Sequence, residues 1–140
     1  MDEYITNVIK MSSKSLKSKD VPVGAIIVKN NKIIARGINT REKKQDILGH
    51  AEINAIKNAT KKLNNWNLSG CDMYVTLRPC SMCMEVIKQS RISNVYYLLD
   101  KSETKKEYSN VNIIKLDNKT KSDEYSVILS NFFKELREKD

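Results

Sequence analysis

Apolar residues recur along the chain with two different spacings, which separate helices from strands. Near the start, apolar side chains return at helical intervals and predict a first helix, at Ile5, Val8, Ile9 and Leu16. Val23 to Val28 is a nearly continuous apolar run, as expected of a strand that is buried on both faces.

A turn signal follows this run. Asn30 and Asn31 tolerate positive φ better than most residues, so the segment Lys29 to Lys32 predicts a tight hairpin. The hairpin leads into a second predicted strand around Ile33 to Arg36.

The rest of the pattern alternates helices with strands. Apolar stripes predict one helix with residues 53, 56, 59 and 63 on its buried face, and another that begins at Pro79. Strands are predicted at Met73 to Leu77, Val95 to Leu99 and Val111 to Ile114. A last helix is predicted after Ser122, whose hydroxyl suits an N-cap, with a stripe at Tyr125, Ile128, Leu129, Phe132, Phe133 and Leu136. This order predicts an α/β protein with a mixed, about five-stranded sheet covered by helices.

Length and composition bound the architecture. With 140 residues, 40% of them hydrophobic, the chain can bury one sizeable core, and we expect a single domain spanning residues 1–140. No apolar run approaches the roughly 20 residues of a membrane-spanning helix, and the first ten residues lack the apolar core of a signal peptide. The three cysteines fit a reducing compartment better than a disulfide framework. We therefore expect a cytoplasmic protein without a membrane partner.

The formal net charge of +8 is compatible with a polyanionic partner such as RNA. Basic pairs are scattered along the sequence, for example at Lys43-Lys44, Lys61-Lys62 and Lys105-Lys106. A solvated lysine-rich surface explains the same charge equally well, because net charge governs nonspecific attraction and not function. Charge alone therefore leaves RNA binding open.

Two short motifs carry the candidate chemistry, His50-Ala51-Glu52 and Pro79-Cys80-Ser81-Met82-Cys83. A neutral imidazole and two thiolates suit zinc, and three protein ligands leave the fourth tetrahedral position open to water. The remaining cysteine, Cys71, follows a turn signal and is predicted to be a core or loop residue, because free cysteines are mostly buried. The sequence therefore predicts one Zn²⁺ per chain, held by His50, Cys80 and Cys83.

Spacing places both motifs at helix starts. Residues two apart lie about 200° apart around a helix, so His50 and Glu52 converge only if they lie at a helix N-terminus. Cys80 and Cys83 are three residues apart, which makes them neighbours on a helix surface. We therefore expect two helix N-termini to point at one metal ion, where their positive dipole ends favour thiolate over thiol.

The combination of H-x-E with P-C-x-x-C resembles the signature of the zinc-dependent cytidine/deoxycytidylate deaminase superfamily, which acts on nucleobases. Within it, the chain is most similar to the bacterial tRNA-specific adenosine deaminases. The similarity covers about residues 3 to 100 well and the last helix loosely. It is carried by Asp20 to Val28, Gly37 to Thr40, Tyr74 to Leu77, Ser90 to Ile92 and Ser130 to Phe133.

The resemblance implies a three-layer α/β/α fold of the cytidine-deaminase type and a hydrolase that converts adenosine to inosine at the wobble position of tRNA. A zinc-activated water would attack the base while Glu52 shuttles protons, unless Glu52 only pairs with the helix dipole in the first turn. Asn39, 11 residues before His50, is the implied contact to the base edge, unless it only serves a turn. The Ala51 N–H and Val23 are further candidate substrate contacts.

The resemblance also implies a homodimer that binds a tRNA anticodon loop. Three departures from the relatives bear on the substrate. Arg78 replaces their usual acidic residue, Met84 follows the second cysteine where they have small residues, and Leu98 to Thr104 replaces a glycine-containing segment. Arg78 either holds a phosphate or is a solvated surface residue.

These departures keep two alternatives open. One is a deaminase of a free nucleobase or nucleoside, such as guanine, cytosine or cytidine. The other is a non-catalytic zinc-bearing subunit that binds RNA or a partner protein. The retention of Glu52 argues against the second alternative, because a structural zinc site does not need that carboxylate.

Overall fold

The computed structural model describes residues 2–100 and 110–138. In chain order the elements are α1 (Asp2–Ser12), the 3₁₀ helix η1 (Ser13–Ser18), β1 (Gly24–Lys29), β2 (Lys32–Ile38), α2 (Arg41–Lys44), α3 (Ala51–Leu63), β3 (Cys71–Leu77), α4 (Ser81–Gln89), β4 (Asn94–Leu99), β5 (Asn112–Lys115) and α5 (Lys119–Glu138). Residues 101–104, part of the altered segment noted above, lie outside the described residues.

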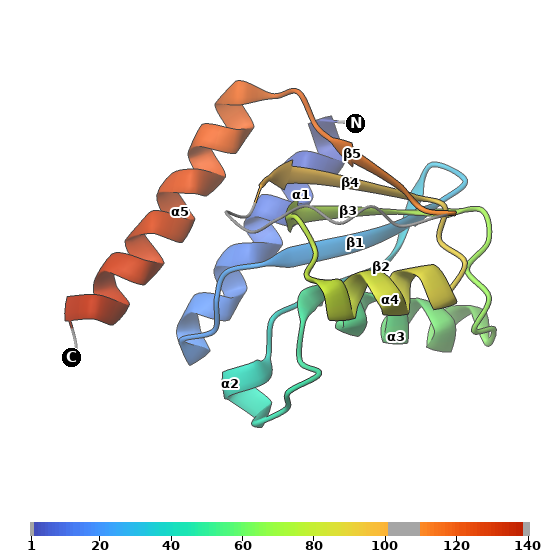
Figure 1. Ribbon diagram of the computed structural model, residues 1–140, viewed down its shortest axis with the longest axis horizontal. Coiled ribbons are helices and arrows are strands. Elements are labelled where there is room, and N and C mark those ends of the chain that lie inside the picture. Colours follow the sequence, from blue (N-terminus) through green and yellow to red (C-terminus); the bar gives the residue numbers. More distant parts are fainter. Residues whose placement is uncertain (1, 101–109, 139–140) are drawn as a thin grey trace.

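The strands form one mixed five-stranded sheet in the order β2-β1-β3-β4-β5 (Figure 1). β1 is antiparallel to both β2 and β3, whereas β3, β4 and β5 are parallel. The prediction of a mixed sheet covered by helices is therefore confirmed. The carboxyl end of β3 and the start of α4 lie at the same end of the sheet, where open α/β sheets bind ligands (Figure 1).

Helices cover both faces of the sheet, which gives the three predicted layers (Figure 1). α3 and α4 pack on the face that carries Ala25 and Ile27, and α1 with the first half of α5 packs on the face that carries Ile26 and Val28. All four strand residues are buried. The continuous apolar run in β1 follows from this arrangement, because successive strand residues point to opposite, covered faces.

The hairpin between β1 and β2 forms as predicted. Asn30 and Asn31 adopt positive φ values of 51° and 62°, as a two-residue hairpin turn of the favoured hand requires. β2 is longer than predicted because its pairing with β1 continues to Ile38, past a register shift between Ile27 and Val28. This extension carries the chain to Asn39, next to the start of α3.

Three helix boundaries differ from the predictions. The last helix begins at Lys119, not after Ser122. Asn118 Oδ1 accepts the Lys121 N–H at 3.1 Å, while the Ser122 hydroxyl donates to the Leu98 carbonyl and lies inside the helix. α1 ends at Ser12, so Leu16 lies in η1 and is 39% exposed.

The third boundary is at the cysteine motif. Cys80 is the N-cap of α4, so Pro79 precedes the helix instead of opening it.

α5 is the longest helix, with 20 residues, of which Tyr125 and Phe132 are buried. In the described part of the chain, no helix has the length and apolar character needed to cross a membrane.

Candidate metal centre

Two helix N-termini converge at the end of the sheet, as their motifs predicted. His50 is the N-cap of α3 and Cys80 is the N-cap of α4, and both have extended backbones with ψ of 144° and 171°. Neither side chain forms a capping hydrogen bond to its own helix. Both side chains are therefore directed to the space between the helices.

The three predicted ligands lie within metal-binding distance of one another. The ligand atoms of His50, Cys80 and Cys83 all lie within 4.8 Å, and His50 Nδ1 is 3.8 Å from Cys80 Sγ and 3.4 Å from Cys83 Sγ. In a tetrahedral site with standard zinc bond lengths, sulfur and nitrogen are about 3.6 Å apart. The residues present thus fit a zinc ion held through Nδ1 and two sulfurs.

Cys71 lies apart from this cluster. It is fully buried at the start of β3, in the core between the sheet and the α3–α4 layer. Burial raises the pKa of the Cys71 thiol, which disfavours the thiolate that a metal ligand must be. The cysteine is a core residue, as its turn context predicted.

A pocket of about 630 Å³ reaches His50, one of the three ligands. His50 and the second residue of α3, Glu52, line it, and Glu52 is only 4% exposed. Val23 and Asn39 also line this pocket, so four of the seven predicted site residues meet there. The other lining residues are Ser18, Lys19, Asp20, Val21, Arg41, Glu42, Gly49, Leu77, Arg78, Phe132, Phe133 and Leu136.

Asn39 and Ala51 bind each other. Asn39 Oδ1 accepts the Ala51 N–H at 2.8 Å, at the first turn of α3. Ala51 is fully buried and is not among the residues that line the pocket. Within the described residues, Asn39 Nδ2 forms no hydrogen bond, so its N–H donors are available to a ligand in the pocket.

Gly37 lets β2 approach the start of α3. A Cβ at this position would collide with the backbone oxygen of Ala51 and the backbone nitrogen of Ala55. Asn54 strengthens the same junction, because its Nδ2 donates to the Ile38 carbonyl at 2.8 Å and to Thr40 Oγ1 at 3.0 Å. The close approach brings Asn39, which follows β2, next to the first turn of α3, where it binds the Ala51 N–H.

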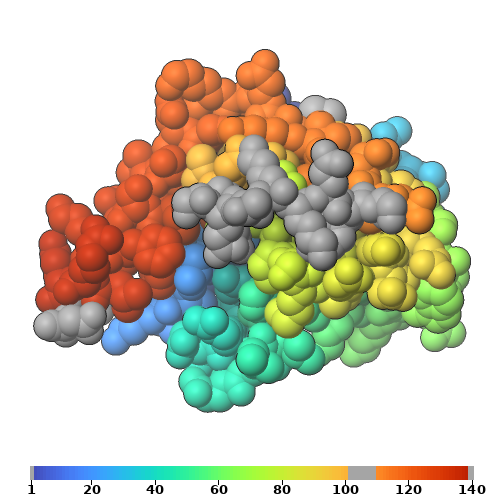
Figure 2. All heavy atoms as spheres, in the orientation of Figure 1, coloured from blue at the N-terminus to red at the C-terminus, as the bar shows by residue number. Residues whose placement is uncertain are grey.

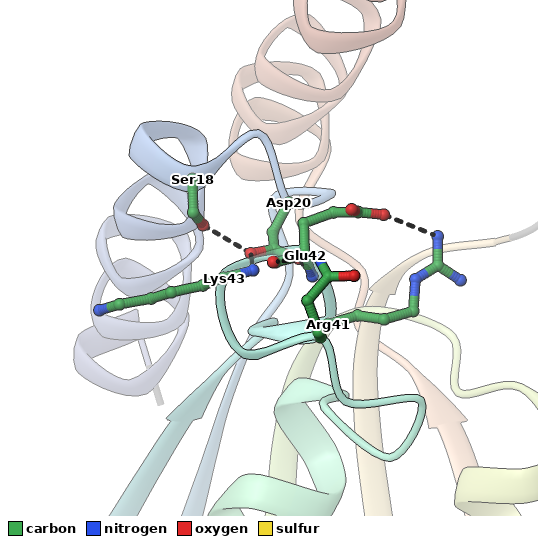
Figure 3. Close-up of polar contacts among 6 residues, drawn as sticks. Ser18, Asp20, Arg41, Glu42 and Lys43 are labelled. Carbon is green, nitrogen blue, oxygen red and sulfur yellow. Dashed lines mark hydrogen bonds and ion pairs between the residues drawn. The ribbon is translucent and has the colours of Figure 1, made fainter.

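Asp20 fixes one wall of the pocket, a role that the sequence did not predict (Figure 3). Its carboxylate accepts the backbone N–H groups of Glu42 at 2.6 Å and Lys43 at 3.2 Å, and the Ser18 hydroxyl at 2.5 Å. The side chain of Asp20 is buried, 2% exposed. It therefore caps α2 from a distance and holds that short helix against the end of η1.

The C-terminal helix forms another wall. In Figure 2, α5 (red), the end of η1 (blue) and α2 (teal) meet at the same side of the molecule, and all three contribute lining residues. The Tyr125 hydroxyl anchors α5 by donating to the Pro22 carbonyl at 2.6 Å. Burial raises the pKa of the Tyr125 hydroxyl. A hydrogen bond with Thr76 lowers this pKa in part, and the nearby charge of Glu52 raises it.

Two departures from the relatives have clear positions. Met84 is buried in the core, 2% exposed, and is not a pocket residue. Arg78 is half-buried and lines the pocket. Its Nη1 donates to the Tyr97 hydroxyl at 3.0 Å, and its guanidinium carbon lies 5.2 Å from the centroid of the Tyr97 ring. Arg78 is therefore not a freely solvated surface residue.

Known proteins resemble this chain over most of its length. The tRNA-specific adenosine deaminase of Aquifex aeolicus is 38% identical over 148 aligned positions, which cover 96% of this chain and 95% of that protein. The tRNA-specific adenosine deaminase of Bacillus subtilis is 42% identical over 94 positions, covering 67% of this chain and 58% of that protein. The aligned part thus spans little more than half of the Bacillus protein.

The fold also has a match among solved structures. A structure from a study of A-to-I editing by tRNA:A34 deaminases at the wobble position of transfer RNA superposes with a TM-score of 0.74 and 26% identity, covering 82% of this chain and 98% of that one. The sheet and its helices thus form the cytidine-deaminase-like fold that the resemblance implied. Residues 1–137 match the model of the MafB19-like deaminases, and the chain belongs to that family, within the cytidine/deoxycytidylate deaminase superfamily.

Proposed function

We propose that this protein deaminates adenosine to inosine at the wobble position of tRNA, by hydrolysis that depends on zinc. The observation that carries the proposal is the convergence of three metal-ligand atoms, one of them from His50, which lines a pocket together with the buried Glu52. The 38% identity to a tRNA-specific adenosine deaminase over nearly the whole chain supports the choice of substrate. The protein would act as a single domain of residues 1–140.

His50, Cys80 and Cys83 would hold one Zn²⁺. When bound, the ion would lower the pKa of a water molecule at the open fourth position and so supply hydroxide near neutral pH. The start of α4 at Cys80 helps to keep both sulfurs as thiolates, because unpaired N–H groups of the first turn favour negative charge.

Glu52 would carry the protons. Its carboxylate takes one proton from the attacking water and gives it to the ring nitrogen beside the attacked carbon. It then takes the remaining proton from the hydroxyl that has added to the carbon and gives it to the exocyclic amine. The C–N bond to that amine then breaks, ammonia leaves, and the base becomes hypoxanthine. The 4% exposure of Glu52 supports this role, because a shielded carboxylate keeps its proton away from bulk water.

Glu52→Gln tests the proton transfer. The amide keeps the size of the side chain but cannot accept and return a proton, so we expect deamination to fall by roughly 10²- to 10⁴-fold. Zinc content, measured by atomic absorption, should stay near one ion per chain. If the variant retained zinc and full activity, Glu52 would only interact with the helix dipole and would not transfer protons.

Substrate contacts remain part of the proposal. We propose that Asn39 binds an acceptor on the base through Nδ2, the amide atom that Ala51 leaves available, and that Val23 forms a wall of the base site. Ala51 would contribute by orienting Asn39, since its N–H is bound to Oδ1.

The proposal includes the cellular context. The anticodon loop of tRNA is the expected partner, in keeping with the net charge of +8.

A homodimer is expected from the resemblance. Apolar surface near the pocket is offered by Ile47, which is 77% exposed, and by Leu48, which is 52% exposed. The three free cysteines fit the cytoplasm. Sedimentation equilibrium of the purified protein tests the dimer.

A side-by-side assay tests the substrate. An anticodon-arm RNA with adenosine at the wobble position is compared with the same RNA carrying inosine, and with free guanine, cytosine, cytidine and adenosine. Inosine formation together with ammonia release on the adenosine-bearing RNA is the expected result. Activity on free guanine or cytosine alone would show that the substrate is a free nucleobase and not RNA. Zinc and RNA binding without any turnover would instead indicate a non-catalytic subunit.

A further inference from the structure

Arg78 is a half-buried cation at the pocket, and it forms no ion pair with the described acidic residues. Among residues 2–100 and 110–138, none of the ion pairs involves its guanidinium. A guanidinium has five N–H donors, and the hydrogen bond to Tyr97 is the one that the described residues provide. The described residues therefore leave the remaining donors to a ligand.

Tyr97 holds the guanidinium in a fixed orientation. The Tyr97 hydroxyl accepts from Nη1 at 3.0 Å, and the ring lies 5.2 Å from the guanidinium carbon, within cation–π distance. Tyr97 itself is rigid, because it lies in β4 and is 4% exposed. The backbone of Arg78 is also fixed, since its N–H donates to the Leu99 carbonyl at 2.9 Å.

The position of Arg78 defines what this cation can reach. It lines the same pocket as His50 and Glu52 and stands two residues before Cys80. Arg41 also lines the pocket, but it lies 3.8 Å from Glu42 and is thus partly neutralised. A nucleotide whose base lies beside Glu52 carries its phosphates away from the base. There an oriented guanidinium, without an ion pair to the described residues, can bind a phosphate through two parallel hydrogen bonds.

We propose that Arg78, oriented by Tyr97, binds a phosphodiester of the RNA next to the nucleotide that is deaminated. This inference rests on the proposed function, because a free nucleobase has no phosphate to bind. Arg78 would then select polynucleotide over free base, and Tyr97 would be a positioning residue.

The test measures RNA binding as a function of salt. Equilibrium dissociation constants for the anticodon-arm RNA are measured in a Glu52→Gln background, with and without Arg78→Gln, Arg78→Lys and Tyr97→Phe. Arg36→Gln is the matched control, because Arg36 is exposed on β2 and its loss changes net charge equally. Zinc content and thermal midpoint of every variant establish that it is folded.

We expect Arg78→Gln to reduce the slope of log K against log salt by about one and to weaken binding on the order of tenfold. Arg78→Lys should keep the slope but bind more weakly, since a lysine cannot bind bidentately. Tyr97→Phe should keep the slope and, in the protein with intact Glu52, raise KM for RNA with little change in kcat. Arg36→Gln should leave all of these near wild type.

Several results would overturn the inference. An unchanged slope in Arg78→Gln, or an equal change in Arg36→Gln, would remove the phosphate contact. In protein with intact Glu52, kcat/KM is measured with and without Arg78→Gln for RNA, adenosine 5′-monophosphate and adenosine. If Arg78→Gln lowered kcat/KM equally for the monophosphate and for RNA, Arg78 would bind the phosphate of a mononucleotide. Failure of the protein with intact Glu52 to deaminate RNA would overturn the proposed function itself. RNA deamination together with an unchanged slope would overturn only the role of Arg78.

Discussion

Asn39 connects the pocket to the first turn of α3 through its two amide atoms. Oδ1 holds the Ala51 N–H, and Nδ2 is the proposed contact to the base. Asn39→Ala removes both functions, whereas Asn39→Asp keeps an acceptor for Ala51 and removes the donor. We expect Asn39→Ala to lower the free energy of unfolding by about 1–2 kcal/mol and Asn39→Asp to stay within about 0.5 kcal/mol of wild type.

Activity should separate from stability in this pair. Both variants are expected to lose on the order of tenfold or more in kcat/KM for RNA, because each lacks the amide donor. Urea denaturation measures the free energy of unfolding, and initial rates of inosine formation measure kcat/KM. Wild-type rates in Asn39→Asp would show that Nδ2 does not touch the base.

At the residue scale, what could be predicted depends on sequence separation. His50, Cys80 and Cys83 converge because each lies in or beside the first turn of its helix, which local spacing reveals. Asp20 caps α2 across 22 residues, and Arg78 meets Tyr97 across 19. Such pairs depend on which strands and loops become neighbours, so no local pattern records them.

At the element scale, a buried hydroxyl helps to hold α5 beside the pocket. Tyr125 is fully buried and donates to the Pro22 carbonyl at 2.6 Å. Tyr125→Phe leaves that carbonyl without its donor, and we expect a loss of about 1–3 kcal/mol in the free energy of unfolding. Far-UV circular dichroism against urea measures it, and the fold should remain because the ring is retained.

The same variant has a signature at high pH. The pKa of Tyr125 is raised in the folded protein, so above about pH 10 the unfolded chain loses a proton that the folded chain retains. Ionisation then favours unfolding, and stability falls by up to about 1.4 kcal/mol per pH unit from this group. The stability advantage of wild type over Tyr125→Phe should therefore be constant below pH 9 and shrink above pH 10. A constant difference up to pH 11 would contradict the raised pKa.

Elements were predictable where burial alone determines them. β1 and β3 follow their apolar runs because both faces of the sheet are covered. The four residues of α2 contain no apolar side chain, and this helix forms where Asp20 supplies acceptors for its first N–H groups. The start of α5 was misplaced for a similar reason, because the Ser122 hydroxyl bonds to β4 and not to its own helix.

At the scale of the whole molecule, a bound zinc would link two helices that pack on the same face of the sheet. Its ligands come from the starts of α3 and α4, so the ion binds the folded chain and stabilises it by mass action. At free zinc 100-fold above the dissociation constant, this contribution is about 2.7 kcal/mol. A strong chelator should therefore lower the thermal midpoint by roughly 10 °C and abolish deamination, and added zinc should restore both.

Two cysteine variants separate this linkage from ordinary packing. Cys80→Ala removes a ligand, so its midpoint should be low and should not respond to the chelator. Cys71→Ala removes a fully buried sulfur from the core, so it should cost about 1 kcal/mol yet keep the full chelator response. Differential scanning calorimetry with and without the chelator measures all three proteins. A chelator response in Cys80→Ala equal to that of wild type would place the stabilising metal elsewhere, because α4 would then contribute no essential ligand.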